Sequence, residues 1–194
     1  PEALPTDFEI RQALDRQVVP DNLEKAGATE GAEQRFQYFL ALLLPLDRVI
    51  QDRVAHPEGD VLYHSLQVFE LACERCPWDE DLLLAALLHD VGKGIDPRDH
   101  VAAGLARLRG HVSDRVLWLI ENHGLAQRVL DGTSGARARR RLTNADDGEA
   151  LDILASCDRE GRLPGRRVRT PEAALQYLRD LEAENDPEAA SGGD

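Results

Sequence analysis

The stretch LLLAALLHDVGK, residues 82–93, constrains the fold of this chain more than any other segment. Its first seven residues are all apolar, so a helix that they form must be surrounded by protein on every side. His89, Asp90 and Lys93 follow, and Lys93 shares a helical face with the other two if the turn continues. An imidazole and a carboxylate in a dry interior are costly unless they are hydrogen-bonded, paired or bound to a metal. The segment therefore predicts half of a metal site.

The length of 194 residues predicts one domain with loose ends. We expect an N-terminal arm over residues 1–32, a helical domain over 33–184 and a disordered polar tail over 185–194. No run of eighteen apolar residues and no secretory signal pattern occurs, which predicts a soluble protein without a membrane partner. The three cysteines are few and odd in number, which favours a cytoplasmic location. A net charge of −13 disfavours bulk DNA binding, although an acidic surface can carry a local basic site.

The hydrophobic pattern has the period of helices, and no alternating segment of strand length stands out, so the predicted fold class is all-α. Capping residues and prolines set the expected helix boundaries. We expect helices from Glu33 with a stop or kink at Pro45, from Asp60 to about Cys76, from Asp79 through the His-Asp pair, from Pro97 to about Arg109, from Ser113 to His123, from about Gly148 to Arg159, and from Pro171 to about Glu184.

Polar residues that lie on or beside the apolar faces of these helices are the candidate metal ligands. They are His64, His89, Asp90, His100, His123 and Asp158. Helical bundles build metal sites in their cores from side chains on facing helices, so the pattern predicts a metal site between facing helices. Mixed nitrogen and oxygen ligation suits one or two divalent ions of Mn, Fe, Co, Ni or Zn, and the sequence does not choose among them.

The order His64, His89-Asp90, Asp158 resembles the HD superfamily of metal-dependent phosphohydrolases, whose ligands run H, HD, D across helices. LLHDVGK is similar to the central motif of that superfamily, and CDREGR around Asp158 is similar to its closing motif. HPEGDVLYHSL is similar to the HD domains attached to some bacterial tRNA nucleotidyltransferases. No stretch resembles the nucleotidyltransferase catalytic head, so CCA addition is not implied. The resemblance covers about residues 58–162 and implies an HD-domain helical bundle.

His100 and His123 match extra histidines of the binuclear branch of the superfamily. If both ligate, the resemblance implies that Asp90 bridges two ions, with His64, His89 and Asp158 on one of them. The alternative is a single ion, with His100 and His123 hydrogen-bonding the substrate or serving as general acid.

The resemblance implies a metal-dependent phosphohydrolase, either a phosphatase or a phosphodiesterase, that uses metal-activated hydroxide. A small phosphorylated substrate such as a nucleotide, or an RNA end, is the favoured substrate. The candidate catalytic residues are Asp90, Lys93, His100 and His123, and Lys93 is also expected to hold a phosphate oxygen. Two alternatives stay open. One is an HD-type di-iron oxygenase, which requires His100 and His123, and the other is a non-catalytic nucleotide- or RNA-binding module.

A basic run contains Arg137, Arg139, Arg140 and Arg141. Arg137 and Arg140 are candidate substrate-binding residues for a nucleotide phosphate or an RNA backbone, and a solvated basic face is the alternative interpretation. Cys73 and Cys76 have CxxC spacing without a second pair, so we interpret them as core residues. His56 and His111 lie in predicted loops and are interpreted as surface histidines.

Overall fold

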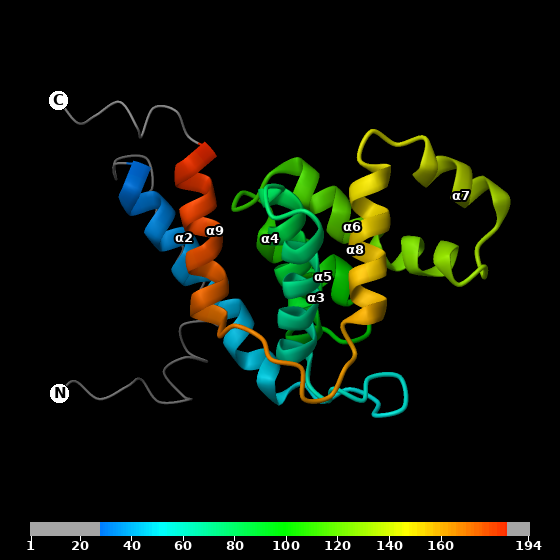
Figure 1. Ribbon diagram of the computed structural model, residues 1–194, viewed down its shortest axis with the longest axis horizontal. Helices are drawn as coiled ribbons and strands as arrows, with labels where there is room; N and C mark the ends of the chain where they lie inside the picture. Colours follow the sequence, from blue (N-terminus) through cyan, green and yellow to red (C-terminus); the bar gives the residue numbers. More distant parts are fainter. Residues whose placement is uncertain (1–27, 186–194) are drawn as a thin grey trace. The chain divides into compact units, whose positions relative to one another are not determined.

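The computed structural model describes residues 28–185 (Figure 1). The chain divides into two compact units, Pro1–Gln34 and Arg35–Asp194. Most of the predicted arm and nearly all of the predicted tail lie outside the described residues, so those boundaries stay predictions. The helical elements are α2 (Ala28–Leu43), η1 (Leu44–Arg48), α3 (Val61–Arg75), α4 (Glu80–Leu88), η2 (Val91–Gly94), α5 (His100–Leu108), α6 (Asp114–Leu130), α7 (Ala136–Thr143), α8 (Gly148–Glu160) and α9 (Pro171–Asn185).

The all-α fold class is confirmed. No strand forms within residues 28–185, where an isolated bridge joins Ile50 to Asp60. No helix in the same range combines the length and the apolar character needed to cross a bilayer.

Side-chain caps begin two helices where the sequence predicts them. At the start of α3, the Asp60 carboxylate accepts a hydrogen bond from the Tyr63 backbone N–H at 2.8 Å. At the start of α4, the Asp79 carboxylate accepts one from the Leu82 backbone N–H at 3.1 Å. Each cap satisfies a backbone donor that the helix itself cannot pair. The caps thereby fix the register of the two helices that carry the first candidate ligands.

Four elements differ from the prediction. α4 ends at Leu88, so the His-Asp pair follows the helix and does not lie within it. α5 begins at His100 and not at Pro97, because Asp96 closes a turn with the Arg98 backbone N–H at 3.0 Å and Asp99 caps the helix. α6 continues through the predicted stop at 123–124 to Leu130, since buried Ala126 extends its apolar face. α7, over 136–143, was not predicted as a helix.

The apolar helix α4 lies in the middle of the core, as its sequence predicts. Every residue from 82 to 88 is at most 6% exposed. α4 contacts α3, α6, α8 and α9, and Figure 1 shows α3, α6 and α8 gathered around it, with α7 on the outer side of α6. Residues 89–93, which follow α4, therefore begin at the centre of the bundle, close to the neighbouring helices.

After α4, the backbone of η2 packs directly against the first turn of α5. A Cβ atom on Gly92 would lie 1.8 Å from the His100 carbonyl oxygen and 2.6 Å from the Gly104 backbone nitrogen. Contacts this short leave no room for any side chain at Gly92. Gly104, one turn after His100 on α5, receives this backbone contact. The two glycines thus hold His100 beside the His-Asp pair.

Candidate metal centre

Five of the predicted site residues converge at one end of the buried helix α4. Ligand atoms of His64, His89 and Asp90 lie within 4.8 Å of one another, and so do ligand atoms of Asp90, His100 and His123. Asp90 belongs to both groups. Four of the five residues are buried, and His100 is half-buried. The structure therefore brings together two adjacent groups of nitrogen and oxygen atoms around one carboxylate.

Backbone carbonyl groups orient three of the imidazole rings. His64 Nδ1 lies 2.9 Å from the Gly161 carbonyl oxygen, His89 Nδ1 lies 3.0 Å from that of Ala86, and His123 Nδ1 lies 2.6 Å from that of Ile120. A carbonyl oxygen only accepts, so Nδ1 carries the hydrogen in each ring. The Nε2 atoms of His89 and His123 are then available to a metal, whereas that of His64 lies 3.0 Å from Asp158 Oδ1. An Nδ1 contact with a backbone carbonyl group is typical of metal-binding histidines.

The Nε2 atom of His89 is the clearest sign that a cation fits this site. It is buried and makes no hydrogen bond to any described residue. It lies 3.3 Å from Asp90 Oδ2, without the alignment of a hydrogen bond. A buried polar atom without a partner is costly, and a bound cation would satisfy it. The donor set, in which imidazole nitrogens surround a carboxylate, suits the predicted divalent transition metals.

Asp158 meets His64 but belongs to neither of the two groups. Asp158 Oδ1 lies 3.0 Å from His64 Nε2 and 3.4 Å from Arg162, and Oδ2 accepts a hydrogen bond from Gln127 at 2.8 Å. Burial alone would raise the pKa of the Asp158 carboxyl group, yet the contact with His64 holds it well below its usual range. Asp158 is therefore a carboxylate placed beside the first group.

Glu58 contacts the other side of His64, and sequence reasoning missed it. The fully buried Glu58 carboxylate lies 3.0 Å from His64 Nδ1 and 2.9 Å from His56 Nδ1. His56 is half-buried in this contact, which departs from its interpretation as a surface histidine. Although burial lowers the pKa of His64, its hydrogen bonds to Asp158 and Glu58 raise it to about 9. The His64 ring is thus held from both sides.

Lys93 lies next to the shared carboxylate, as the sequence predicts. Its ammonium group is 2.7 Å from Asp90 Oδ2 and donates to Gln51 Oε1 at 2.7 Å. An ammonium group has three donors, so one stays available for a further acceptor. Burial opposes ionisation of Asp90, but its neighbours His89 and Lys93 hold its pKa well below the usual range. The carboxylate is therefore charged at neutral pH.

His100 and His123 are the two rings on the far side of Asp90. His100 Nε2 is 3.5 Å from Asp90 Oδ1, and the two ring centroids are 5.9 Å apart. Burial lowers the pKa of both rings, and the neighbouring His89 adds to the effect at His123. Neutral imidazole is the form that binds a metal, so both rings are suited to ligation.

The predicted phosphate-binding residues Arg137 and Arg140 lie apart from this cluster. Both are exposed on α7, and neither makes a hydrogen bond or ion pair with a described residue of the cluster. α7 packs on α6 and α8 through its buried residue Leu142. These arginines therefore belong to a separate surface.

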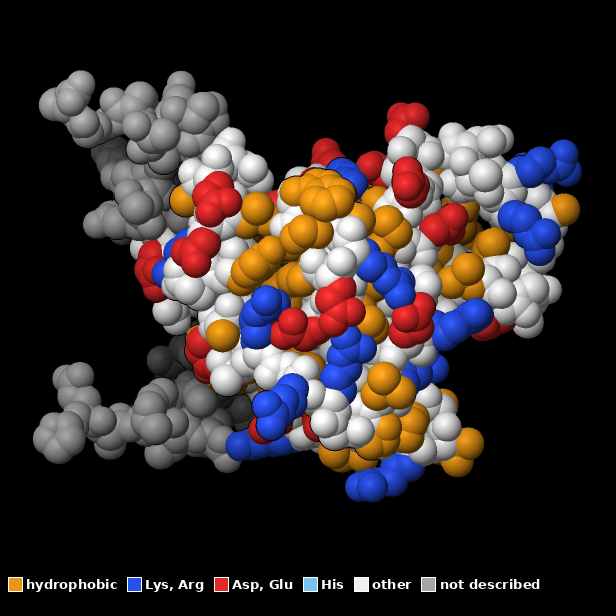
Figure 2. Space-filling view, viewed as in Figure 1, with side chains coloured by type: hydrophobic (Ala, Val, Ile, Leu, Met, Phe, Trp, Pro, Cys, Tyr) orange, Lys and Arg blue, Asp and Glu red, His pale blue; other side chains and the backbone are white. Residues whose placement is uncertain are grey.

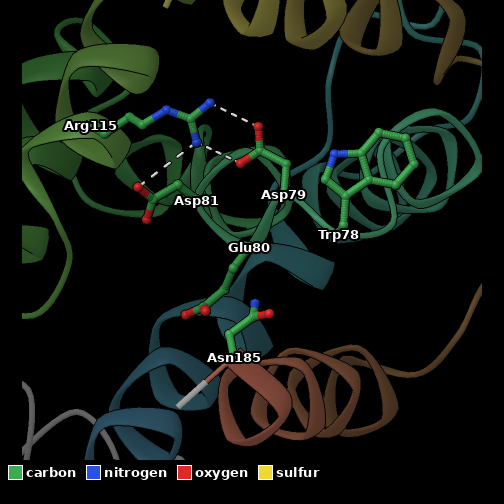
Figure 3. Close-up of a pocket in the computed structure, with 6 residues that line it drawn as sticks. All are labelled: Trp78, Asp79, Glu80, Asp81, Arg115 and Asn185. Atoms are coloured by element: carbon green, nitrogen blue, oxygen red, sulfur yellow. Dashed lines mark hydrogen bonds and ion pairs between the residues drawn. The ribbon is translucent and has the colours of Figure 1, made fainter. Parts of the chain in front are cut away.

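A hollow at the start of α4 provides a contrast with the cluster (Figure 3). It is lined by Trp78, Asp79, Glu80, Asp81, Arg115 and Asn185. The Arg115 guanidinium group already donates to Asp79 at 2.5 and 2.8 Å and to Asp147 at 2.7 Å. Since its positive charge is paired and the lining contains three acidic side chains, this hollow does not suit a phosphate.

The sequence profile of the HD domain family matches residues 61–159, which is about half of the chain. The chain belongs to the HD domain family, and the resemblance seen in the motifs is confirmed. The matched region begins with α3 and ends in α8, so it contains every candidate ligand from His64 to Asp158.

Curated relatives come from two strains of Stenotrophomonas maltophilia. The chain is 29% identical over 110 residues to the "Multifunctional CCA protein" of strain K279a and equally to that of strain R551-3. The aligned region covers 53% of this chain and 26% of each relative. The chain therefore spans about a quarter of the length of these relatives.

Proposed function

We propose that the protein is a metal-dependent phosphohydrolase that cleaves a phosphomonoester or phosphodiester, with a nucleotide or an RNA end as the favoured substrate. The observation that carries the proposal is the buried set of oriented Nε2 atoms around Asp90, above all the unpartnered Nε2 of His89. Membership of the HD domain family supports it, as does the similarity to two relatives that are each named "Multifunctional CCA protein".

His64, His89, Asp90, His100, His123 and Asp158 would hold one or two divalent ions. A bound ion would supply a Lewis acid and lower the pKa of bound water toward neutrality. With two ions, the two groups that share Asp90 correspond to two coordination sites. With one ion, His100 and His123 are neutral rings positioned to hydrogen-bond the substrate.

Lys93 would hold the substrate phosphate beside Asp90. Its ammonium group is oriented by Asp90 and Gln51 and keeps a third N–H for a phosphate oxygen. A charge-assisted hydrogen bond of this kind orients the phosphate and stabilises the charge that develops on its oxygens. Lys93→Met is therefore expected to reduce turnover while leaving the metal content unchanged.

The test combines metal quantification with a hydrolysis assay. Purified protein is analysed for bound Mn, Fe, Co, Ni and Zn, and then assayed with each metal on an aryl phosphate, a bis-aryl phosphodiester and an oligoribonucleotide with a terminal phosphate. Asp90→Asn should lose both metal and hydrolysis. Asp152→Asn makes the same chemical change at an exposed position on α8 and should lose neither. Absence of both metal and turnover in the wild-type protein refutes the proposal.

A di-iron oxygenase is the second candidate, because the Asp90, His100 and His123 group provides a second coordination site. Two irons per chain with substrate-dependent oxygen consumption would favour it over the hydrolase. A binding module that keeps its metal structurally would bind nucleotides tightly without turnover. The cytoplasmic location expected from the three cysteines stays a prediction.

A further inference from the structure

A second hollow lies between α6 and α7, away from the metal ligands. It has a volume of about 530 Å³, and its lining includes Trp118, Glu121, Asn122, Leu125, Arg128 and Arg141. Trp118, Asn122 and Leu125 follow each other at helical spacing, so they share the α6 face that looks toward α7. We call this hollow the α6–α7 groove.

The walls of the groove combine an aromatic surface with apolar side chains. Trp118 and Leu125 are half-buried, so part of each side chain faces the hollow. The Asn122 side chain is buried and donates to the Trp118 carbonyl oxygen at 2.8 Å. A partly exposed indole ring in a hollow is a stacking platform for a flat ring, and every nucleobase offers such a face.

The cationic side chains of the groove lack acidic partners. Arg128 makes no ion pair within the described residues, and Arg141 makes a single hydrogen bond, to Asn122 Oδ1 at 3.2 Å. By contrast, Arg75 and Arg166 elsewhere on the surface are paired with Glu160 and Glu74. In a chain with a net charge of −13, unpaired guanidinium groups at one hollow form a local positive site.

α7 extends the positive charge beyond the groove. Its sequence ARARRRLT contains four arginines and no acidic residue, and Arg137, Arg139 and Arg140 are exposed without ion pairs among the described residues. Figure 2 shows Lys and Arg side chains over the α7 part of the molecule. Glu121 is the single carboxylate in the groove lining, which also includes two guanidinium groups. The charge therefore favours a ligand with more than one negative group.

The groove is adjacent to the metal centre along α6. Asn122 lines the groove and the next residue, His123, belongs to the metal centre. Successive residues of a helix point about 100° apart, so the groove and the metal centre lie against neighbouring faces of α6. A chain-like ligand in the groove would thus lie against the same helix that carries His123.

We propose that the α6–α7 groove binds a single-stranded oligonucleotide, with one base stacked on Trp118 and neighbouring phosphates on Arg128 and Arg141. Guanidinium groups match phosphate geometry, and an aromatic ring accepts any base, so the recognition is independent of sequence. This binding site requires no metal and goes beyond the proposed hydrolysis.

The test uses the full chain in EDTA, so that binding is measured without hydrolysis. The chain contains two tryptophans, and Trp78→Phe leaves Trp118 as the single tryptophan, which is excited selectively above the absorption of tyrosine. This variant is titrated with an eight-nucleotide oligoadenylate, as RNA and as DNA, and the quenching of Trp118 fluorescence is recorded. Saturable quenching by either oligonucleotide is expected, and its absence overturns the proposal.

Charge variants in the same background identify the phosphate contacts. Arg128→Ala/Arg141→Ala should weaken binding at least about tenfold and reduce the salt slope of log K by about 1.4, since each phosphate contact on a single strand contributes about 0.7. Arg107→Ala/Arg109→Ala removes two exposed arginines of the α5 end and should leave both quantities unchanged. Circular dichroism confirms that each variant is folded.

Two outcomes of these titrations overturn the proposal. One is equal affinity of the groove variant and the α5 control. The other is competition by adenosine monophosphate or inorganic phosphate at the same concentrations as the oligonucleotide, which assigns the groove to a small anion. Hydrolysis by the metal-loaded wild-type protein is measured separately, so failure of the groove and failure of the proposed hydrolase are distinguishable.

Discussion

Gly92→Ala tests how the metal centre is held together. The added Cβ atom would lie 1.8 Å from the His100 carbonyl oxygen, whereas ordinary contacts begin at 3.4 Å. η2 and the first turn of α5 must therefore separate by about 1.6 Å, because the opposing atoms are backbone atoms and cannot rotate away. Overpacking of this kind costs about 3 kcal/mol of unfolding free energy, the upper end of the usual range.

The same displacement moves His100 away from Asp90, where the two side chains are now 3.5 Å apart. We expect the variant to lose stability in urea unfolding and to bind less metal by elemental analysis. Gly104→Ala is the matched control, since its Cβ atom would meet the Gly92 nitrogen at 3.3 Å and helix propensity favours alanine by about 1 kcal/mol. Its unfolding free energy should change little. If Gly92→Ala unfolds at the wild-type urea concentration with full metal content, the close backbone contact does not hold the site.

Three further predictions concern other parts of the molecule. Glu58→Gln, which removes a carboxylate charge beside His64, should lower metal affinity about 10- to 100-fold in competition with a chromophoric chelator; an unchanged affinity rejects this positioning role. Asp79→Asn keeps a capping side chain but loses the ion pair with Arg115, so it should cost about 1 kcal/mol of unfolding free energy at pH 6. Burial raises the pKa of Asp79, but Arg115 outweighs this effect, so the pKa in the folded state is lowered. The ion pair therefore stabilises the folded state fully above the unfolded-state pKa of about 3.9, and this stabilisation is lost as the pH falls through the lower folded-state pKa. A cost that persists at pH 2 contradicts this assignment. Cys76 should react first with a thiol reagent at pH 8, because burial raises the pKa of the other two thiols to about 11; faster labelling of either of those is the contrary result.

Local signals explain why much of the fold was predictable. α4 was predicted because its residues are apolar on every side, and its start was predicted because Asp79 is a capping residue. Both signals act within one turn of helix and need no knowledge of the partner helices. α7 was not predicted because Leu142 is its single buried residue, so its sequence has no apolar stripe that would indicate a helix.

The candidate ligands were predictable as a set, but their supporting contacts were not. Each candidate lies on or beside an apolar helical face, which marks it in the sequence. Glu58 carries no such mark, because its contact with His64 depends on a loop closed by the Gln51 N–H to the Gly59 carbonyl oxygen, with Gly59 at φ +112°. Gln127 likewise reaches Asp158 only after α6 and α8 have packed. Such contacts are properties of the tertiary structure.

The contact between His64 and Asp158 joins residues that are 94 positions apart in the chain. Closing so long a loop costs more conformational entropy than forming a contact between residues close in sequence. This pair is therefore expected to form late in folding. A partly folded chain would contain the His-Asp pair that follows α4 before His64 and Asp158 have come together. Under the metal binding proposed above, metal at a free concentration of 100 times Kd would add about 2.7 kcal/mol of stability to the finished site. Metal uptake would then report completed folding, and a pulse of metal during refolding would time the last step of assembly.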